Sequence, residues 1–174
     1  MLHPVKLRPL QPEDLKTVMM WAKDTEFCLA NDWSLEIPEE RLKTHWTVII
    51  SEASDNLIRK GITLNGELIG YADLAQINPL EARASLGYAI GNSSLWGQGF
   101  GFVGARLMLE LAFENLKLER VTAEVNAANT RSLRVLEKLG FKLEGVLRQH
   151  ETYRGVRGDV HLFGLLREEF LMPI

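Results

Sequence analysis

The stretch Trp96-Gly97-Gln98-Gly99-Phe100-Gly101-Phe102-Val103-Gly104 stands where the apolar pattern of the chain changes its period. Before it, residues 85–90 read Ser-Leu-Gly-Tyr-Ala-Ile and predict a strand. After it, apolar residues recur at helical spacing from Phe100 to Leu116, and charged residues repeat at four-residue steps on the opposite face: Arg106, Glu110 and Glu114. The sequence therefore predicts a strand, a glycine-rich turn and an amphipathic helix.

Such a turn favours an anion, because the backbone N–H groups of a helix N-terminus point outward and glycine lets a phosphate approach them. The letters Gly99 to Gly104 also match G-x-G-x-x-G, the fingerprint of dinucleotide-binding folds. That fold places the glycines early in a parallel array, whereas a predicted hairpin precedes them here. An NAD(P)-dependent oxidoreductase is therefore a second hypothesis. No Lys-Ser or Lys-Thr follows, which excludes a P-loop.

Working outward from the turn, Asn65-Gly66 lies between two apolar runs and predicts a hairpin of antiparallel strands at 59–64 and 68–77. Further strands are expected at 5–8, 121–126, 141–148 and 159–166, and further helices at 12–21, 38–50 and 129–139. We therefore expect one α/β domain over residues 1–174. Its mixed, mostly antiparallel central sheet is flanked by helices, with a right-handed strand-helix-strand crossover at the glycine turn.

Composition narrows the class of protein. The chain of 174 residues has 20 Lys and Arg against 23 Asp and Glu. Because it has no surplus of basic residues, nucleic acid is not expected as a partner. Cys28 is the single cysteine, which excludes an internal disulfide and a multi-cysteine metal site and favours a reducing compartment. Apolar runs are too short to span a membrane, and residues 1–15 lack the apolar core of a secretory signal. We expect a cytoplasmic protein that binds no metal and no membrane.

A second motif runs from Asn126 to Phe141. Asn129 and Ser132 lie three residues apart and share a face near the start of the predicted helix. The structural alternative is that Asn129 only caps the helix, with Gly140 closing its other end.

Together, the two motifs make the chain resemble the GNAT acetyltransferase superfamily. Three segments make it similar to the RimJ/RimL-like branch, namely Val5 to Leu10, the turn at Trp96 to Gly99, and the closing stretch Arg157 to Phe170. Many members of the superfamily carry Arg or Gln where this chain has Trp96. The amide cradle does not depend on that side chain.

The resemblance implies a site for acetyl-CoA. The CoA pyrophosphate would bind at the glycine turn, and the pantetheine arm would enter between splayed strands at 85–90 and 120–126. The residues expected to bind the cofactor are Leu86, Tyr88, Ala89, Ile90, Gly97, Gln98, Gly99, Phe100, Gly101, Phe102, Asn129, Arg131 and Ser132. Arg134 and Lys138 extend a basic patch from Arg131, although a solvated helix face explains Lys138 slightly better.

The resemblance also implies a direct transfer of acetyl to an amine. Glu151, ten residues beyond Phe141, would act as the base, and Ser132 would donate a proton to the departing thiolate. His150 is the alternative base, while Tyr153 and Tyr88 are rival proton donors.

The resemblance implies the N-terminal α-amine of a protein, of the ribosomal protein type, as the most favoured acceptor. The pKa of such an amine, about 7.7–8.0, means that it needs only mild help from a base. Polyamines, aminoglycosides and other small amines remain alternatives, as does a CoA-binding module without catalysis. Four residues between the first two helices could receive a cationic acceptor, although the composition of a loop explains them equally well: Asp24, Glu26, Asp32 and Trp33. Strand 162–166 could complete the core or help form a homodimer, and the family resemblance favours a homodimer.

Overall fold

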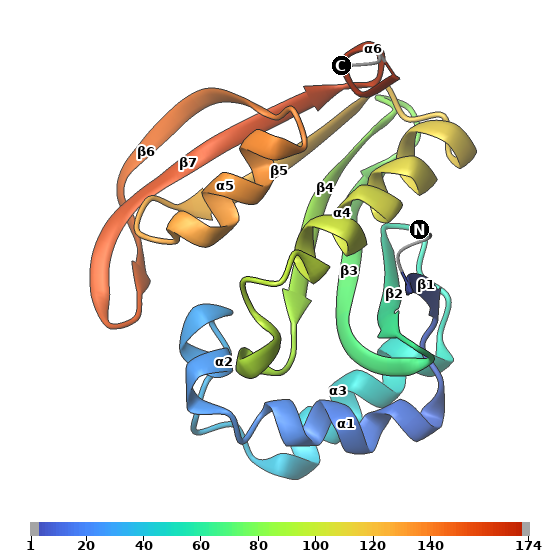
Figure 1. Ribbon diagram of the computed structural model, residues 1–174, viewed down its shortest axis with the longest axis vertical. Coiled ribbons are helices and arrows are strands. Elements are labelled where there is room, and N and C mark those ends of the chain that lie inside the picture. The colour runs from blue at the N-terminus through green and yellow to red at the C-terminus, as the bar shows by residue number, and fades with distance from the viewer. Residues whose placement is uncertain (1–3, 172–174) are drawn as a thin grey trace.

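The computed structural model describes residues 4–171, so residues 1–3 of the segment tested for a secretory signal lie outside the described residues. A seven-stranded sheet has the order β1-β2-β3-β4-β5-β7-β6 (Figure 1). Every neighbouring pair is antiparallel except β4 and β5. The strands are β1 Val5–Pro9, β2 Leu57–Leu64, β3 Glu67–Asn78, β4 Arg83–Ile90, β5 Arg120–Asn126, β6 Lys142–Tyr153 and β7 Val156–Leu166. The expected mixed, mostly antiparallel sheet is confirmed.

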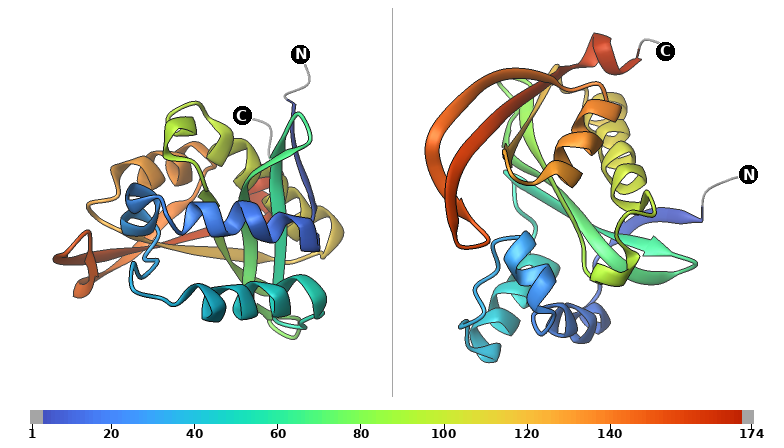
Figure 2. Two further views of the ribbon diagram at one scale, coloured as in Figure 1. Left: turned by 90° about the horizontal axis from the view of Figure 1, so that it is seen from below. Right: turned by 60° about the vertical axis from the view of Figure 1, so that its left-hand side comes forward.

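Helices flank this sheet (Figures 1 and 2). They are α1 Leu15–Trp21, α2 Thr25–Ala30, α3 Glu39–Ser51, α4 Phe100–Glu110, α5 Thr130–Lys138 and α6 Arg167–Leu171. A 3-10 turn at Pro12–Asp14 leads into α1, and a π-helical turn at Leu111–Asn115 continues α4. Within the described residues, no helix is long and apolar enough to cross a membrane.

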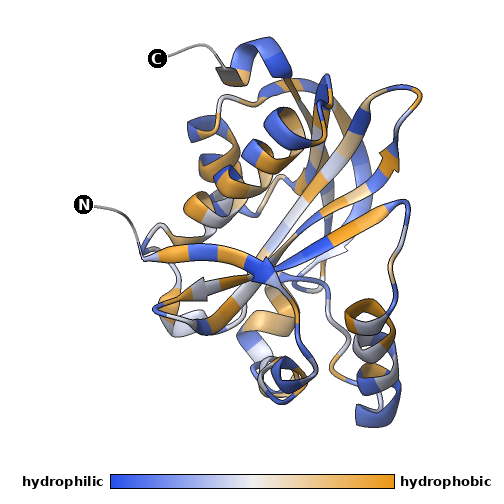
Figure 3. Cartoon of the chain, turned by 90° about the vertical axis from the view of Figure 1, so that its right-hand side faces the viewer, coloured by the Kyte–Doolittle hydropathy of each residue, from blue (hydrophilic) through white to orange (hydrophobic). Residues whose placement is uncertain are grey.

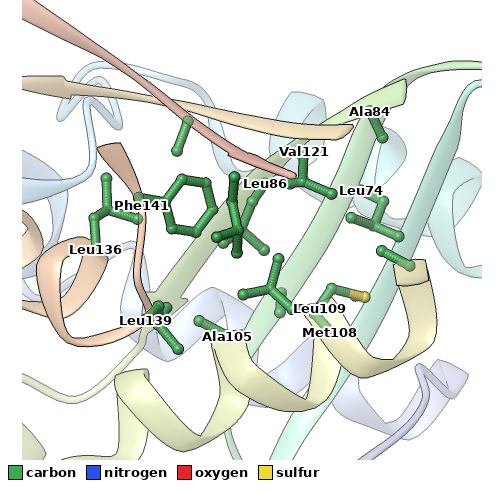
Figure 4. Close-up of a cluster of buried hydrophobic side chains, with 14 of the residues drawn as sticks. Leu74, Ala84, Leu86, Ala105, Met108, Leu109, Val121, Leu136, Leu139 and Phe141 are labelled. Atoms are coloured by element: carbon green, nitrogen blue, oxygen red, sulfur yellow. The ribbon is translucent and has the colours of Figure 1, made fainter. Parts of the chain in front are cut away.

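Side chains of β3 alternate between two separate cores, as the period of two along a strand requires. Ala72 and Leu74 belong to the larger core, where α4 and α5 pack on the sheet (Figure 4). Tyr71 belongs to a smaller aromatic core with α1, α2 and α3. Helix α4 turns an apolar stripe toward the sheet and polar residues away from it, as Figure 3 shows by hydropathy. The sheet thus separates two helical layers.

A buried ion pair lies in the smaller core. The Arg59 guanidinium donates to both carboxylate oxygens of Asp73 at 2.6 Å. It lies 4.7 Å from the ring centroid of Trp46 and 4.6 Å from that of Tyr71. Both charges are therefore partnered, and the arginine joins α3 to the sheet.

The sheet opens at its centre. Strands β4 and β5 pair over Arg83–Ser85 and Arg120–Thr122, and the described residues show no ladder pairs between them beyond Ser85. The two strands diverge in Figure 1, and β5 stays paired with β7 along its length. The splay implied by the family resemblance is confirmed, and it leaves one backbone edge of Leu86 to Ile90 facing the opening.

The structure differs from the sequence expectations at two places that matter for the site. The sequence predicts no helix between residues 21 and 38, whereas the structure has α2 there, capped by Asp24. A helix of six residues is too short to show a clear helical period. Strand β6 continues to Tyr153 rather than ending at Arg148. Glu151 therefore lies within a strand, and an irregularity between Leu147 and Glu151 hides that strand from its periodicity.

Candidate active site

The glycines of the turn at 96–104 have different physical roles. Gly97 and Gly99 adopt positive φ angles of 77° and 86°, and a Cβ at either would meet no described atom within 4 Å. Glycine is needed at both positions because the backbone is left-handed there, and Gly99 is the N-cap of α4. At Gly101 a Cβ would lie 2.9 Å from Tyr88 Cε2, and at Gly104 it would lie 2.5 Å from Ile62 Cδ1. The last glycine of the G-x-G-x-x-G match therefore serves helix packing on β2.

The start of α5 brings Ser132 to the opening between β4 and β5. The Asn129 side chain caps the helix by accepting a hydrogen bond from the Ser132 N–H at 3.2 Å, and Gly140 follows the helix with φ of 90°. Both capping predictions are confirmed. Burial raises the pKa of Tyr88, although a hydrogen bond with Ser132 and the charge of Arg131 act in the opposite direction. Tyr88 is thus a neutral phenol beside Ser132 at physiological pH.

A cavity of about 290 Å³ lies between the glycine turn and α5. Its walls include most of the expected cofactor residues together with a basic face of α5, and the full lining is Ala30, Asn31, Tyr88, Ala89, Ile90, Leu95, Trp96, Gly97, Gly99, Phe100, Gly101, Phe102, Asn129, Arg131, Ser132, Arg134, Val135 and Lys138. Lys138 is exposed, as a solvated helix face requires, and it also lines this cavity. The first turn of α4 and three cations give the cavity a positive electrostatic character.

Trp96 organises one wall of this cavity. Its Nε1 donates to the Ile90 carbonyl oxygen at 2.9 Å, and the Arg131 guanidinium lies 3.8 Å from its ring centroid. The ring therefore holds a cation at the mouth of the glycine turn. Gln98 was expected to bind the cofactor, but it lines neither this cavity nor its neighbour, and its amide donates to the Ser94 carbonyl at 3.2 Å.

A second cavity, of about 230 Å³, continues the first on the β6 side of the opening. The two share the lining residues Ala30, Asn31, Tyr88, Asn129 and Ser132. Leu86, an expected cofactor residue, lines this second cavity, as do Glu151 and Tyr153. The structure therefore brings Ser132 and Glu151 to one cavity, with Ser132 at the junction of both. His150, the alternative base, lines neither.

Acidic residues of the α2 region have separate uses. Asp24 caps α2 by accepting from Phe27 N and also accepts from Ser93 N. Glu26 accepts two hydrogen bonds from Arg154 at 2.6 and 2.8 Å. Of the four residues expected to receive a cationic acceptor, Asp32 lines the second cavity, while Trp33 packs in the aromatic core and donates to the Tyr71 hydroxyl. Asp32, Glu124 and Glu151 are the carboxylates of this cavity.

Asn126 is a residue of the site that the sequence analysis missed. It is 5% exposed, and its side-chain nitrogen donates to Glu151 Oε1 at 3.3 Å. Its side-chain oxygen accepts from the Ala128 N–H at 3.0 Å, on the loop that leads to α5. The sequence contains a signal for it, because Asn126 is a polar residue at the end of the alternating strand 121–126. Asn126 joins Glu151 to the segment that carries Ser132.

Comparison with known proteins places this geometry in a family. A family model described as an acetyltransferase (GNAT) domain matches residues 5–142. The uncharacterized N-acetyltransferase p20 of Bacillus licheniformis is 32% identical over 142 residues, which cover 82% of this chain and 70% of that protein. Spermidine N(1)-acetyltransferase of Escherichia coli K12 is 30% identical over 152 residues, covering 87% and 79%.

A solved structure of RimL, a ribosomal L7/L12 α-N-protein acetyltransferase in complex with coenzyme A, superposes on the chain with a TM-score of 0.82. The two are 18% identical, and the match covers 94% of each chain, so the likeness concerns the fold. The NAD(P) hypothesis is wrong. With its splayed strands, glycine turn and matched domain, the chain belongs to the GNAT acetyltransferase family and is an N-acetyltransferase that uses acetyl-CoA.

Proposed function

We propose that this enzyme transfers the acetyl group of acetyl-CoA directly to the α-amine of a peptide or protein. One observation carries the proposal: Ser132 and Glu151, from α5 and β6, line the same cavity, and Ser132 also lines the cavity at the glycine turn. An acyl donor in one cavity and an amine in the other would meet at Ser132.

The cavity at the glycine turn fits coenzyme A. The N-terminus of α4 and the cations Arg131, Arg134 and Lys138 suit its phosphates. The unpaired edge of β4 from Leu86 to Ile90 offers backbone groups to the pantetheine amides. The thioester would then reach the junction near Tyr88 and Ser132.

Direct transfer requires that a C–N bond forms while the thioester C–S bond breaks. Glu151 takes the proton that the amine loses, through a water if the distance requires it. The leaving thiolate takes a proton from the Ser132 hydroxyl, with neutral Tyr88 beside it as the rival donor, and solvent restores the donor's proton after CoA leaves. A backbone N–H on the open edge of β4 polarises the thioester carbonyl.

The α-amine suits this site because a single carboxylate can serve as its base. At pH 7 about one α-amine in seven is already neutral, against about one in 2,500 for an amine with the pKa of lysine. Glu26, which could hold a second charge of a polyamine, is occupied by Arg154. A polyamine is the second candidate acceptor, favoured by the three carboxylates of the cavity and by the spermidine N(1)-acetyltransferase relative.

We also propose that residues 1–174 form one acetyltransferase domain of the RimJ/RimL-like branch, since one sheet supports both cores. The cytoplasm is the proposed location, because the single cysteine, Cys28, is buried and fits a reducing compartment. A homodimer stays a prediction.

The test compares matched acceptors at saturating acetyl-CoA. We expect lysine-free peptides with a free α-amine to have kcat/KM values at least about 100-fold above that of spermidine, as the difference in neutral fraction implies. The same peptides with a blocked N-terminus serve as the control and should not react. A preference for spermidine would overturn the α-amine proposal. Binding of acetyl-CoA without transfer to any amine would indicate a silent module.

A further inference from the structure

Strand β6 contains a bulge that determines which of its residues faces the second cavity, called here the acceptor cavity because the proposed function places the amine there. Leu147 lies opposite Val160 of β7, and Glu151 lies opposite Gly158, so four steps along β6 match two along β7. In a regular ladder Gln149 would stand opposite Gly158. The two extra residues, with Gln149 at φ of 51°, put Glu151 there instead.

Two side chains of β7 hold the bulge. The Gln149 N–H donates to Asp159 Oδ1 at 2.8 Å, and Arg157 Nη1 donates to the Gln149 carbonyl oxygen at 2.9 Å. Both backbone groups of the residue with positive φ are therefore satisfied by side chains. A glutamine in the left-handed region is unfavourable by itself, so these contacts stabilise a conformation that the chain would otherwise avoid.

The same short segment reaches the other half of the site. The Asp159 carbonyl oxygen accepts a hydrogen bond from the Ala127 N–H at 2.9 Å, next to Asn126. Asn126 in turn donates to Glu151 Oε1. Asp159 is thus linked to both partners of the hydrogen bond between Asn126 and Glu151. Its side chain holds the bulge that places Glu151, and its carbonyl oxygen binds the residue after Asn126.

We propose that Asp159, assisted by Arg157, is a positioning residue that holds Glu151 in the acceptor cavity. The inference rests on the proposed function, because it assumes that Glu151 is the base. Asp159 acts through the backbone of Gln149 and does not touch the substrate. Its loss lets β6 relax toward a regular ladder and moves the carboxylate of Glu151 away from the amine.

The experiment is a double-mutant cycle. Asp159→Ala removes the acceptor of the Gln149 N–H, whereas Asp159→Asn keeps an oxygen in its place. Each is made alone and together with Glu151→Gln, and kcat, KM for both substrates and the dissociation constant of acetyl-CoA are measured. Glu144→Ala is the matched control, because it removes a contact of β6 with Arg120 at the far end of the strand.

We expect Asp159→Ala to lower kcat by about 10- to 100-fold, the scale of a misplacement of about 1 Å, with acetyl-CoA affinity unchanged. Asp159→Asn should restore most of the rate, and Glu144→Ala should lose none. In the Glu151→Gln background Asp159→Ala should cost nothing further, since the residue it positions is already disabled. Arg157→Ala should show the same pattern with a smaller loss and gives a second route if Asp159→Ala fails to fold.

Other outcomes overturn the inference. An unchanged kcat in Asp159→Ala, or an equal loss with and without Glu151→Gln, would mean that Asp159 does not act through Glu151. If Glu151→Gln alone leaves turnover intact, the assigned base is wrong and the inference fails with it. If Glu151→Gln lowers kcat while the Asp159 and Arg157 variants keep the wild-type kcat, the inference fails and the proposed function stands.

Discussion

Replacing Gly99 by alanine perturbs the backbone of the glycine turn without a steric clash. Gly99 has φ of 86°, and a Cβ there would meet no described atom within 4 Å, so the cost comes from the left-handed conformation. That cost is about 1–2 kcal/mol for a residue with a side chain. Residues 97–99 are exposed, so we expect the turn to relax to negative φ and to rotate its amides away from the cavity.

Binding of acetyl-CoA then has to restore the original conformation, and the conformational cost of the left-handed alanine is subtracted from the free energy of binding. A cost of about 1–2 kcal/mol corresponds to a dissociation constant for acetyl-CoA about 5- to 30-fold higher. Calorimetric titration measures it, and thermal unfolding shows how much strain the free protein keeps. The matched control is Gly66→Ala in the β2–β3 turn, which has φ of 89° and equally open surroundings.

Gly66→Ala should lower thermal stability by a similar amount and leave acetyl-CoA affinity unchanged. Wild-type affinity in Gly99→Ala would refute the reasoning, because the amides of the turn could not then be holding the phosphates.

Three further predictions follow from named contacts. Cys28→Ser should leave kcat within about twofold of wild type, because the thiol is buried, its pKa is raised by burial and the charge of Asp24, and it lines neither cavity; a large loss would contradict direct transfer. Arg154→Ala frees Glu26 of α2 and should raise kcat/KM for spermidine relative to peptides; an unchanged ratio in competition assays would remove Glu26 from acceptor selection. Burial raises the pKa of Asp14, but hydrogen bonds from Arg8 and Gln11 and the charge of Arg8 outweigh it, so the pKa is lowered. The pair of Arg8 and Asp14 therefore stabilises the fold above about pH 4, and this contribution is lost as the pH falls through the lowered pKa. Asp14→Asn should therefore flatten the acid limb of the unfolding temperature against pH, and an unchanged limb would count against the pair.

Sequence predicts the parts of the site that depend on local backbone chemistry. The glycine-rich turn before α4 and the caps of α5 at Asn129 and Gly140 are consequences of residue type and spacing, whereas the positive φ angles at Gly97 and Gly99 come from the structure. The hairpin at Asn65-Gly66 belongs to the same class, since its turn conformation is encoded in two residues.

The remaining parts depend on contacts between distant segments. The bulge at Gln149 exists because Asp159 and Arg157 satisfy its backbone, ten and eight residues further along the chain. Arg154 pairs with Glu26 across 128 residues and removes a carboxylate that looked available from composition. No periodicity within one segment reports such partners, so the position of Glu151 in a strand was missed.

We propose that acetyl-CoA binds between β4 and β5, and that Ser132 and Glu151 carry the proton transfers when its acetyl group passes to an amine. The most direct measurement combines calorimetric titration of acetyl-CoA with transfer to a free-α-amine peptide, for the wild type and for the Ser132→Ala, Glu151→Gln double variant. We expect micromolar binding that changes by less than about twofold, and a rate of transfer at least about 100-fold lower in the variant. Unchanged transfer in the variant, or a wild-type protein that does not bind acetyl-CoA, would contradict it.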